Sequence, residues 1–387
     1  MPVLHPPKAV AVDTDEVKVS SPWGSRGYVT VDHPPPAAKP TSSSRRLAAH
    51  HALSTSLLGG DLGILRDTLL PSFALHSGLS AIAYVAGRLS DRVEAKDMLW
   101  PAAQVANAWW AAIGSQVISD NIPAGTALRS LNRPRRLVLS GVTIWGARLF
   151  CRLVHRSLKR PGSDSDDPRY EALKKQEPRG WTVFWNKALW ALFLPEVFFQ
   201  TVIGLPFTVP FSRPLGGVTL KASSMCHSIG QAVAVGLFSA GLALEVLADW
   251  QLDGFKESGE EWNKRTMCRE GVWGLVRHPN YLGDALVHLS FPLLLYASDM
   301  LTPIVLLGPL ANYIFLRFYR GDKENEGNQA KRYGIEDVSK KVDFDRYRKE
   351  LNAFWPGTNQ VSNKWAWIVV GCGVAGAVVE KVIQEFL

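Results

Sequence analysis

The chain of 387 residues has few cysteines, and their spacing suggests no shared metal or redox site. Its four cysteines are Cys151, Cys226, Cys268 and Cys372. Zinc sites and redox pairs need two cysteines close in sequence, which this pattern lacks. The nine histidines also include no pair spaced four residues apart, as a helical metal site would need. We therefore expect no bound metal, and thiols that remain free.

The N-terminal segment lacks the apolar core of a signal peptide. Four acidic residues within the first 32 positions argue against a mitochondrial transit peptide, which avoids acids. Residues 1–60 are rich in proline, serine and alanine and carry too little apolar surface to offset the entropy of ordering, so we predict disorder there. Insertion would then be directed by the first membrane helix, with the endoplasmic reticulum as the expected location.

Apolar residues are abundant instead, at 47% of the chain, and they are gathered into long blocks. A helix rises about 1.5 Å per residue, so about 20 apolar residues cross a bilayer core of about 30 Å. Many of the 14 tryptophans stand at block edges, where indole rings favour the membrane interface. We predict an all-α, polytopic transmembrane helix bundle of about seven to eight spans. The predicted segments are 67–88, 98–119, 137–154, 183–209, 229–250, 282–298, 300–318 and 364–383.

The net charge is +8, and the lysine and arginine residues that produce it lie between these blocks. This distribution is typical of the loops of a membrane protein and argues against nucleic-acid binding. The loops 155–180 and 251–281 and the stretch 317–350 are basic and fall on one side of the membrane. The loop 210–228 has only two basic residues and falls on the other side. Cytoplasmic loops carry the excess of lysine and arginine, so the basic side is expected to face the cytosol. Four arginines within residues 129–136 fall on the lumenal side and do not follow this rule, so either a span near residue 100 is miscounted or this loop is an exception.

A glycine pattern near the C-terminus matches the dinucleotide-binding motif in letters only. Residues 371–376 read Gly-x-Gly-x-x-Gly, but no strand precedes them and they lie inside an apolar block. Small residues in a membrane helix allow close packing against another helix, which is the role we predict.

The densest polar motif is the run Arg277-His278-Pro279 at the start of an apolar block. Pro279 favours a helix that begins near residue 280, so Arg277 and His278 would lie where backbone N–H groups point outward, which is an anion site. The alternative is an interfacial turn whose charged residues reach the headgroups. Three polar residues follow in the first turn of the helix: Asn280, Tyr281 and Asp284.

Further polar groups interrupt the other apolar blocks. Glu245 and Asp249 lie on one face of a single helix, and charged groups inside a membrane are costly and usually functional. Arg148 also needs a buried partner. Glu196 lies one turn before Gln200 and could donate a proton, or the two could serve helix packing. Loops expected to cover the cytosolic side carry Arg169, Tyr170, Arg320 and Arg332, with a solvated basic loop as the alternative.

These motifs, in this order, resemble the steroid 5-alpha-reductase C-terminal-like membrane proteins. The resemblance covers residues 140–357. Similar Arg-His-Pro-x-Tyr turns occur in sterol reductases and in isoprenylcysteine and phospholipid methyltransferases. The matching runs are Trp145 to Leu149, Asp167 to Tyr170, Gln200 to Pro206, Glu245 to Phe255, Gly271 to Asp284 and Glu326 to Pro356.

The resemblance implies an oxidoreductase that holds NADPH at the cytosolic mouth and reduces a carbon–carbon double bond of a steroid, sterol or other lipid from the bilayer. It implies 137–357 as the catalytic membrane domain, while the apolar blocks predict N-terminal membrane helices in 61–136 and a C-terminal membrane helix in 358–387. We expect Tyr281 or Glu196 to donate the proton. The implied cofactor-binding residues are Arg148, Arg169, Tyr170, Asp249, Arg277, His278, Asn280, Tyr281, Asp284, Arg320 and Arg332.

Two alternatives remain open at this point. S-adenosylmethionine-dependent methyltransferases share the Arg-His-Pro turn, but their cofactor is a sulfonium cation that needs carboxylates more than arginines. A non-catalytic membrane scaffold descended from such enzymes is the other.

Overall fold

The computed structural model describes residues 16–20, 26–30, 63–160, 166–212, 219–220, 224–258, 266–319, 321–336 and 338–386. The chain divides into two units, Met1–Thr55 and Ser56–Leu387. In the first unit, strands β1 (Glu16–Ser20) and β2 (Arg26–Thr30) form an antiparallel pair. The valines of both strands favour extended structure. The segment 1–60, which was predicted to be disordered, therefore contains an antiparallel strand pair. The other residues of that segment lie outside the described part of the chain.

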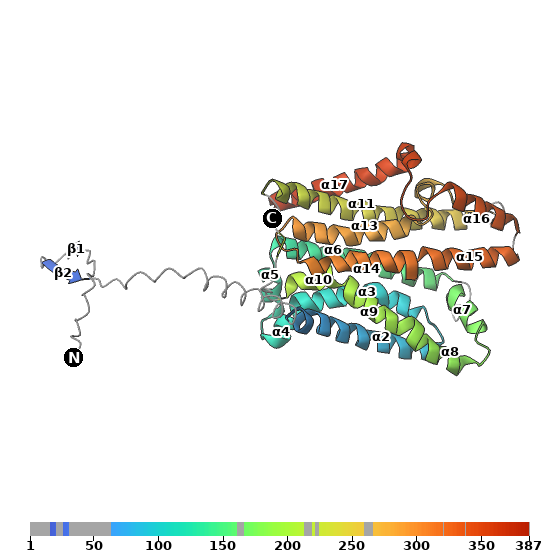
Figure 1. The fold of residues 1–387 in the computed structure, drawn as a ribbon, viewed down its shortest axis with the longest axis horizontal. Helices are drawn as coiled ribbons and strands as arrows, with labels where there is room; N and C mark the ends of the chain where they lie inside the picture. Colours follow the sequence, from blue (N-terminus) through green and yellow to red (C-terminus); the bar gives the residue numbers. More distant parts are fainter. Residues whose placement is uncertain are drawn as a thin grey trace, which may run out of the picture. The chain divides into compact units, whose positions relative to one another are not determined.

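The described part of the second unit forms a helix bundle, shown in Figure 1. Each of the eight predicted membrane segments coincides with a helix or with a consecutive series of helices. The elements are η1 (Leu65–Leu69), α2 (Leu70–Ser90), α3 (Ala95–Trp109), η2 (Trp110–Gly114), α4 (Ser115–Ser119), α5 (Ala124–Ser130), α6 (Arg133–Leu158), α7 (Pro168–Lys175), α8 (Trp181–Ala188), η3 (Leu189–Phe193), α9 (Leu194–Ile203), α10 (Leu205–Thr208), η4 (Val209–Phe211), α11 (Ser224–Glu257), η5 (Gly271–Gly274), α13 (Pro279–Tyr296), η6 (Pro303–Leu306), α14 (Leu307–Ile314), η7 (Phe315–Tyr319), α15 (Asp322–Glu336), α16 (Val338–Glu350), η8 (Thr358–Ser362) and α17 (Lys364–Phe386).

Four helices are long and apolar enough to cross a membrane by length and composition: Leu65–Ser90, Arg133–Leu158, His227–Glu257 and Lys364–Phe386. A bent pair, Trp181–Ile203 and Leu205–Phe211, counts as a fifth if it is one broken span. This is approximately consistent with the prediction of seven to eight spans. The structure therefore confirms an all-helical bundle with several membrane-spanning helices.

Proline and side-chain caps set several helix starts. Helix α13 begins at Pro279, one residue from its predicted start, because proline lacks the N–H that the first turn cannot use. Helix α7 begins at Pro168, and the Asp167 carboxylate accepts a hydrogen bond from the Arg169 N–H at 3.0 Å.

Glycines bring α11 close to two neighbours. A Cβ placed on Gly283 of α13 would lie 2.6 Å from the Gly241 carbonyl oxygen of α11. A Cβ on Gly373 of α17 would lie 2.7 Å from the Gly236 carbonyl oxygen of α11. The glycine pattern at 371–376 thus serves close helix packing, as predicted.

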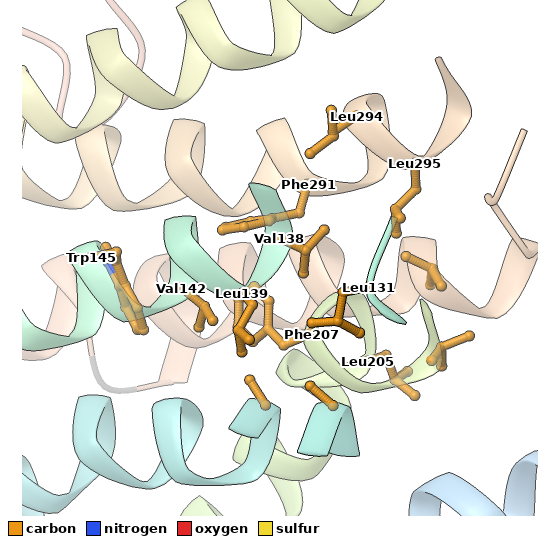
Figure 2. Close-up of a cluster of buried hydrophobic side chains, with 14 of the residues drawn as sticks. Leu131, Val138, Leu139, Val142, Trp145, Leu205, Phe207, Phe291, Leu294 and Leu295 are labelled. Carbon is orange, nitrogen blue, oxygen red and sulfur yellow. The ribbon is translucent and has the colours of Figure 1, made fainter. Parts of the chain in front are cut away.

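The main hydrophobic core lies where α6, α10 and α13 meet, as Figure 2 shows. Val138, Val142 and Trp145 project from α6 toward Phe207 of α10 and Phe291 of α13, and all five are at most 2% exposed. The rings of Phe207 and Phe291 pack edge to face at 4.8 Å. This core fixes α6, which carries Arg148 one turn beyond Trp145.

The helices α7, α15 and α16 lie at one end of the bundle, and α4 and α5 lie at the other (Figure 1). The arginines near α5, which did not follow the charge rule, are used in packing. Arg133 forms an ion pair with Glu380 of α17, and the Arg135 Nε donates to the Pro210 carbonyl at 2.7 Å. The Arg136 Nη2 donates to the Arg129 carbonyl at 3.1 Å. These contacts give a physical reason for basic residues at this end.

Candidate functional site

A cavity of about 680 Å³ is lined by residues from α3, α6, α7, α9, α11 and α13 to α16. Ligand sites of small molecules and cofactors are typically of this size. All the predicted site residues that the structure describes line it, although they come from positions up to 184 apart in sequence. They are Arg148, Arg169, Tyr170, Glu196, Asp249, Arg277, His278, Asn280, Tyr281, Asp284 and Arg332. Arg320 lies outside the described residues.

Arg148 finds the buried partners that its position requires. Its Nη1 donates to the Glu245 Oε2 at 2.5 Å, and its Nη2 donates to Asp249. Arg152, one turn further along α6, contacts the Asp249 Oδ2 through its Nε at 3.3 Å. The second carboxylate oxygen of Glu245, Oε1, is buried in the cavity lining and has no hydrogen-bond partner among the described residues. It is an acceptor that a ligand could use.

Asp284 is held by two neutral donors at the inner side of the cavity. The Trp145 Nε1 and the Asn312 Nδ2 each donate to one of its carboxylate oxygens at 2.9 Å. The His288 Nδ1 lies 2.9 Å from the Asp284 backbone oxygen. Asn312 was not predicted, and its only signal was a lone amide inside the apolar segment 300–318. The pairing fixes the carboxylate between α6, α13 and α14.

The Arg277-His278 turn ties α13 to the helices that cover the cavity. The Arg277 Nε and Nη2 donate to the two oxygens of Glu326 at 2.8 and 3.1 Å, and the Nη1 donates to the Arg348 and Leu351 carbonyls. The His278 Nε2 lies 2.9 Å from the Glu326 Oε1. Arg277 lines the cavity as predicted, but most of its donors already bind protein groups. Its contacts hold α15 and α16 in place.

Tyr281 follows this turn and presents a half-buried ring to the cavity. Its ring stacks on the His278 imidazole, with centroids 5.3 Å apart and planes 11° apart. Asn280, also half-buried, lines the same cavity. The turn thus places a phenol and an amide at the cavity wall while Arg277 and His278 anchor it.

Glu326 makes the packing of α15 dependent on pH. Burial opposes its charged form, but hydrogen bonds from His278 and Arg277, and the charge of Arg277, lower its pKa from 4.5 to about 2. A lowered carboxyl pKa adds stability above pH 4.5, and this stability is lost as the pH falls from 4.5 toward 2. The difference corresponds to about 3 kcal/mol.

We therefore expect the thermal unfolding midpoint of the wild-type protein to fall steeply as the pH drops from 4.5 toward 2. In Glu326→Gln the midpoint should be lower at pH 7, with a shallower fall on acidification, because this carboxylate no longer titrates. Glu324→Gln, on the exposed side of the same helix, is the control and should keep the wild-type slope. Equal slopes in Glu326→Gln and the wild-type protein would contradict this role.

A second charged network centres on Lys96 and Asp97, neither of which was predicted as a site residue. The Lys96 Nζ donates to the Glu196 Oε1 at 2.5 Å and to the Asp97 Oδ1 at 2.9 Å. The Arg169 Nη2 and the Tyr170 hydroxyl both donate to Asp97, at 3.0 and 2.8 Å. Lys96 and Asp97 stand just before the predicted segment 98–119, where charges resemble a solvated helix end. The Glu196 Oε1 thus already accepts a hydrogen bond from the buried Lys96.

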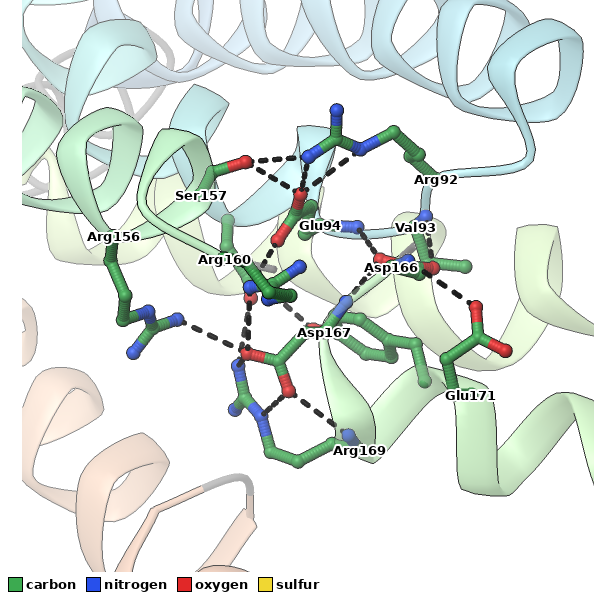
Figure 3. A network of polar contacts seen from close by, with 12 residues as sticks. Arg92, Val93, Glu94, Arg156, Ser157, Arg160, Asp166, Asp167, Arg169 and Glu171 are labelled. Carbon is green, nitrogen blue, oxygen red and sulfur yellow. Dashed lines mark hydrogen bonds and ion pairs between the residues drawn. The ribbon is translucent and has the colours of Figure 1, made fainter. Parts of the chain in front are cut away.

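The short helix α7 is fixed to the start of α3, as Figure 3 shows. The Asp166 carboxylate accepts hydrogen bonds from the backbone N–H groups of Val93 and Glu94 at 2.6 and 3.1 Å. Burial opposes the charged form of Asp167, but the charge and hydrogen bonds of Arg169 lower its pKa. These contacts position Arg169 and Tyr170 at the cavity wall.

The charged and polar residues that line the cavity differ widely in their exposure. Glu245 and Asn312 are at most 2% exposed, whereas the side chain of Arg156 is 44% exposed and Lys256 and Arg332 are exposed. Lys256 has no hydrogen bond or ion pair within the described ranges of the chain. Within those ranges, no group of three or more histidine, cysteine, aspartate or glutamate residues gathers as metal ligands. The cavity lining thus offers carboxylates, amides and basic side chains as hydrogen-bonding groups.

Fold and site together define a helical membrane protein with a polar ligand cavity among its helices. A family described as "Protein of unknown function (DUF1295)" matches residues 83–350, and the chain belongs to this family. The match includes α3 and its Lys96–Asp97 pair, which the resemblance at 140–357 did not cover. No curated protein and no solved structure matches the chain.

Proposed function

We propose that this protein is an integral membrane oxidoreductase that uses NADPH to reduce a carbon–carbon double bond of a steroid, sterol or other lipid. The observation that carries the proposal is the 680 Å³ cavity, which gathers every described residue that the resemblance assigns to NADPH. The DUF1295 family is associated with steroid 5-alpha-reductase-like proteins, which supports the same activity. By the charge distribution of the loops, the cavity would open to the cytosol, in the endoplasmic reticulum.

The cavity residues fit the groups that NADPH presents. Its phosphates need cations, which Lys256, Arg156 and Arg332 offer at the rim. Its amide and hydroxyl groups need acceptors, and the Glu245 Oε1 is a buried acceptor with no partner among the described residues. When bound, NADPH supplies a hydride.

The protein would orient the reactants and provide the proton. Of the two predicted donors, Tyr281 fits better, because Glu196 already accepts a hydrogen bond from Lys96. A lipid substrate suits the side of the cavity lined by Trp100, Phe315 and Leu316. Nearby apolar side chains on α9 and α14, such as Phe198, are largely exposed, as expected for a surface in contact with lipid.

Replacing Lys256 tests the proposal at a cavity residue that forms no hydrogen bond or ion pair with the described residues. We expect purified protein in detergent or nanodiscs to bind NADPH, measured by calorimetry. Lys256→Gln should weaken binding by roughly 10- to 100-fold, since a hydrogen bond to a charged group contributes about 1.5–3 kcal/mol. Lys256→Arg should retain most of the affinity.

Lys159→Gln is the matched control, because Lys159 is exposed at the end of α6, pairs with Glu257 and does not line the cavity. Its affinity for NADPH should equal that of the wild-type protein. A wild-type protein that unfolds cooperatively yet binds no NADPH would refute the proposal. Equal affinities of Lys256→Gln and the wild-type protein would remove Lys256 from the site.

A methyltransferase is the second candidate, and the acidic inner side of the cavity favours it. Glu245, Asp249 and Asp284 lie together there, and carboxylates suit the sulfonium cation of S-adenosylmethionine. The two functions separate in one assay of thermal stability. Stabilisation by S-adenosylmethionine, unaffected by Lys256→Gln, supports the methyltransferase; stabilisation by NADPH that Lys256→Gln reduces supports the reductase. If neither cofactor stabilises the protein, both enzymatic proposals fail and a scaffold remains.

A further inference from the structure

Four polar side chains are buried among α2, α3 and α9, apart from the lining of the cavity. His76, Gln104, Asn107 and Gln200 are 1%, 0%, 1% and 4% exposed. Polar groups inside a membrane bundle are costly unless they are hydrogen-bonded, and they are often functional. The proposed reaction uses none of the four, and the family resemblance, whose matching runs include Gln200, assigns none of them a role.

These side chains bond to one another only in part. The Gln104 Nε2 donates to the Gln200 backbone carbonyl at 2.9 Å, and the Asn107 Nδ2 lies 3.2 Å from the His76 Nε2. The Gln200 side chain interacts with the His76 ring. Four atoms have no partner with good geometry among the described residues: the His76 Nδ1, the Gln104 Oε1, the Asn107 Oδ1 and the Gln200 Oε1.

No rotation of the two amides on α3 satisfies this group. If Gln104 were turned over, its oxygen would face the Gln200 carbonyl oxygen, and two acceptors would meet. If the Asn107 amide were turned over, its oxygen could accept a hydrogen bond from His76. Its amino group would then occupy the position where the oxygen now lacks a partner. With the amides as they stand, His76 Nδ1–H and Gln200 Oε1 are a matching donor and acceptor. The Gln104 and Asn107 side-chain oxygens accept no hydrogen bond from the described residues.

Gly204 leaves space beside both amides. A Cβ placed on it would lie 3.0 Å from the Gln104 Oε1 and 3.4 Å from the Asn107 Nδ2. A side chain there would press on the amides, so the glycine keeps the position clear. The Asn107 Oδ1 belongs to the same amide as this Nδ2, so both acceptors that lack a partner belong to amides beside Gly204. A small molecule with two donor hydrogens suits them.

The cluster also continues the polar wall of the cavity deeper into the bundle. On α9, Gln200 follows Glu196 by one turn, and on α3, Gln104 follows Trp100 by one turn; Glu196 and Trp100 line the cavity. Residues four apart lie on the same face of a helix. The Glu196 and Gln200 side chains therefore lie one turn apart on the same face of α9, and Gln200 contacts Gln104 and His76.

We propose that His76, Gln104, Asn107 and Gln200 bind an ordered water molecule, whose two O–H groups donate to the Gln104 and Asn107 side-chain oxygens. The site is a hydrated extension of the cavity between α2, α3 and α9. This proposal does not depend on which cofactor the cavity binds.

Electron cryo-microscopy of the full chain in nanodiscs, with a rigid binding protein attached, tests the site at a resolution that shows waters. We expect density within hydrogen-bonding distance of both the Gln104 and Asn107 amides. Gly204→Ala should remove it, while Gly78→Ala on α2, whose Cβ would meet nothing within 4 Å, should retain it. If Gly204→Ala does not fold, Gln104→Met serves instead and should also remove the density. Amides that bond to each other, with no density beside them, would overturn the proposal.

A monovalent cation is the competing occupant, because amide oxygens also bind sodium. Thermal unfolding midpoints in NaCl, KCl and choline chloride at equal ionic strength separate the two. Equal midpoints in the three salts are expected for water. A midpoint raised several degrees by NaCl alone, and no longer raised in Gly204→Ala, would overturn the assignment to water.

Discussion

Replacing Arg148 with methionine is expected to destabilise the bundle by about 3–5 kcal/mol, the cost of leaving buried charges without their partner. Arg148 holds both Glu245 and Asp249, and the Glu245 side chain is only 3% exposed. Methionine keeps the unbranched shape of the side chain but offers neither charge nor donor. The loss should appear as a lower midpoint of thermal unfolding in detergent and as lower expression.

The matched control is Arg136→Met on the same helix. Arg136 is exposed, and its Nη2 donates to the Arg129 backbone carbonyl. Its loss should change stability by no more than about 0.5 kcal/mol. Adding Glu245→Gln and Asp249→Asn to Arg148→Met should recover part of the lost stability, because the unpaired charges are then removed as well. A near-wild-type Arg148→Met protein would show that Glu245 and Asp249 do not depend on it.

The sequence predicted most of the bundle because its signals are local. Long apolar blocks mark helices by length alone, and Pro279 marks a helix start through its missing N–H. It also predicted that Arg148 needs a partner and that Glu245 and Asp249 share a face. It could not show that these groups meet, since their contact joins residues 97 and 101 positions apart. That contact exists only once α6 and α11 pack together.

The same limit explains what the sequence missed at the site. Lys96 and Asp97 look like a solvated helix end until α7 and α9 bring Arg169 and Glu196 against them. Arg277 has the pattern of an anion site, but Glu326 of α15 takes two of its donors. A local sequence pattern indicates the kind of group that a residue can bind. The packing of the helices then determines which group of that kind contacts it.

Gly283→Ala is expected to lower the thermal unfolding midpoint by roughly 5–10 °C, because overpacking a tight contact costs about 1–3 kcal/mol or more. The new Cβ would lie 2.6 Å from the Gly241 carbonyl oxygen and 2.8 Å from the Glu245 Cγ. The backbone oxygen cannot move aside alone, so α11 and α13 must separate. Glu245 and the adjacent Asp284 line the cavity, so ligand affinity should fall along with stability.

Gly371→Ala on α17 is the control, because its Cβ would meet nothing within 4 Å. Alanine favours helix over glycine, so this variant should equal or exceed the wild-type stability. Both substitutions reduce the backbone flexibility of a glycine to the same degree, but only Gly283→Ala introduces a close contact. The comparison therefore separates the effect of the contact from the effect of flexibility. If Gly283→Ala unfolded at the wild-type temperature and bound ligand with wild-type affinity, the close approach of α11 and α13 would not be what positions Glu245 and Asp284. If stability fell but ligand affinity did not, ligand binding would not depend on the close spacing of α11 and α13 that positions Glu245 and Asp284.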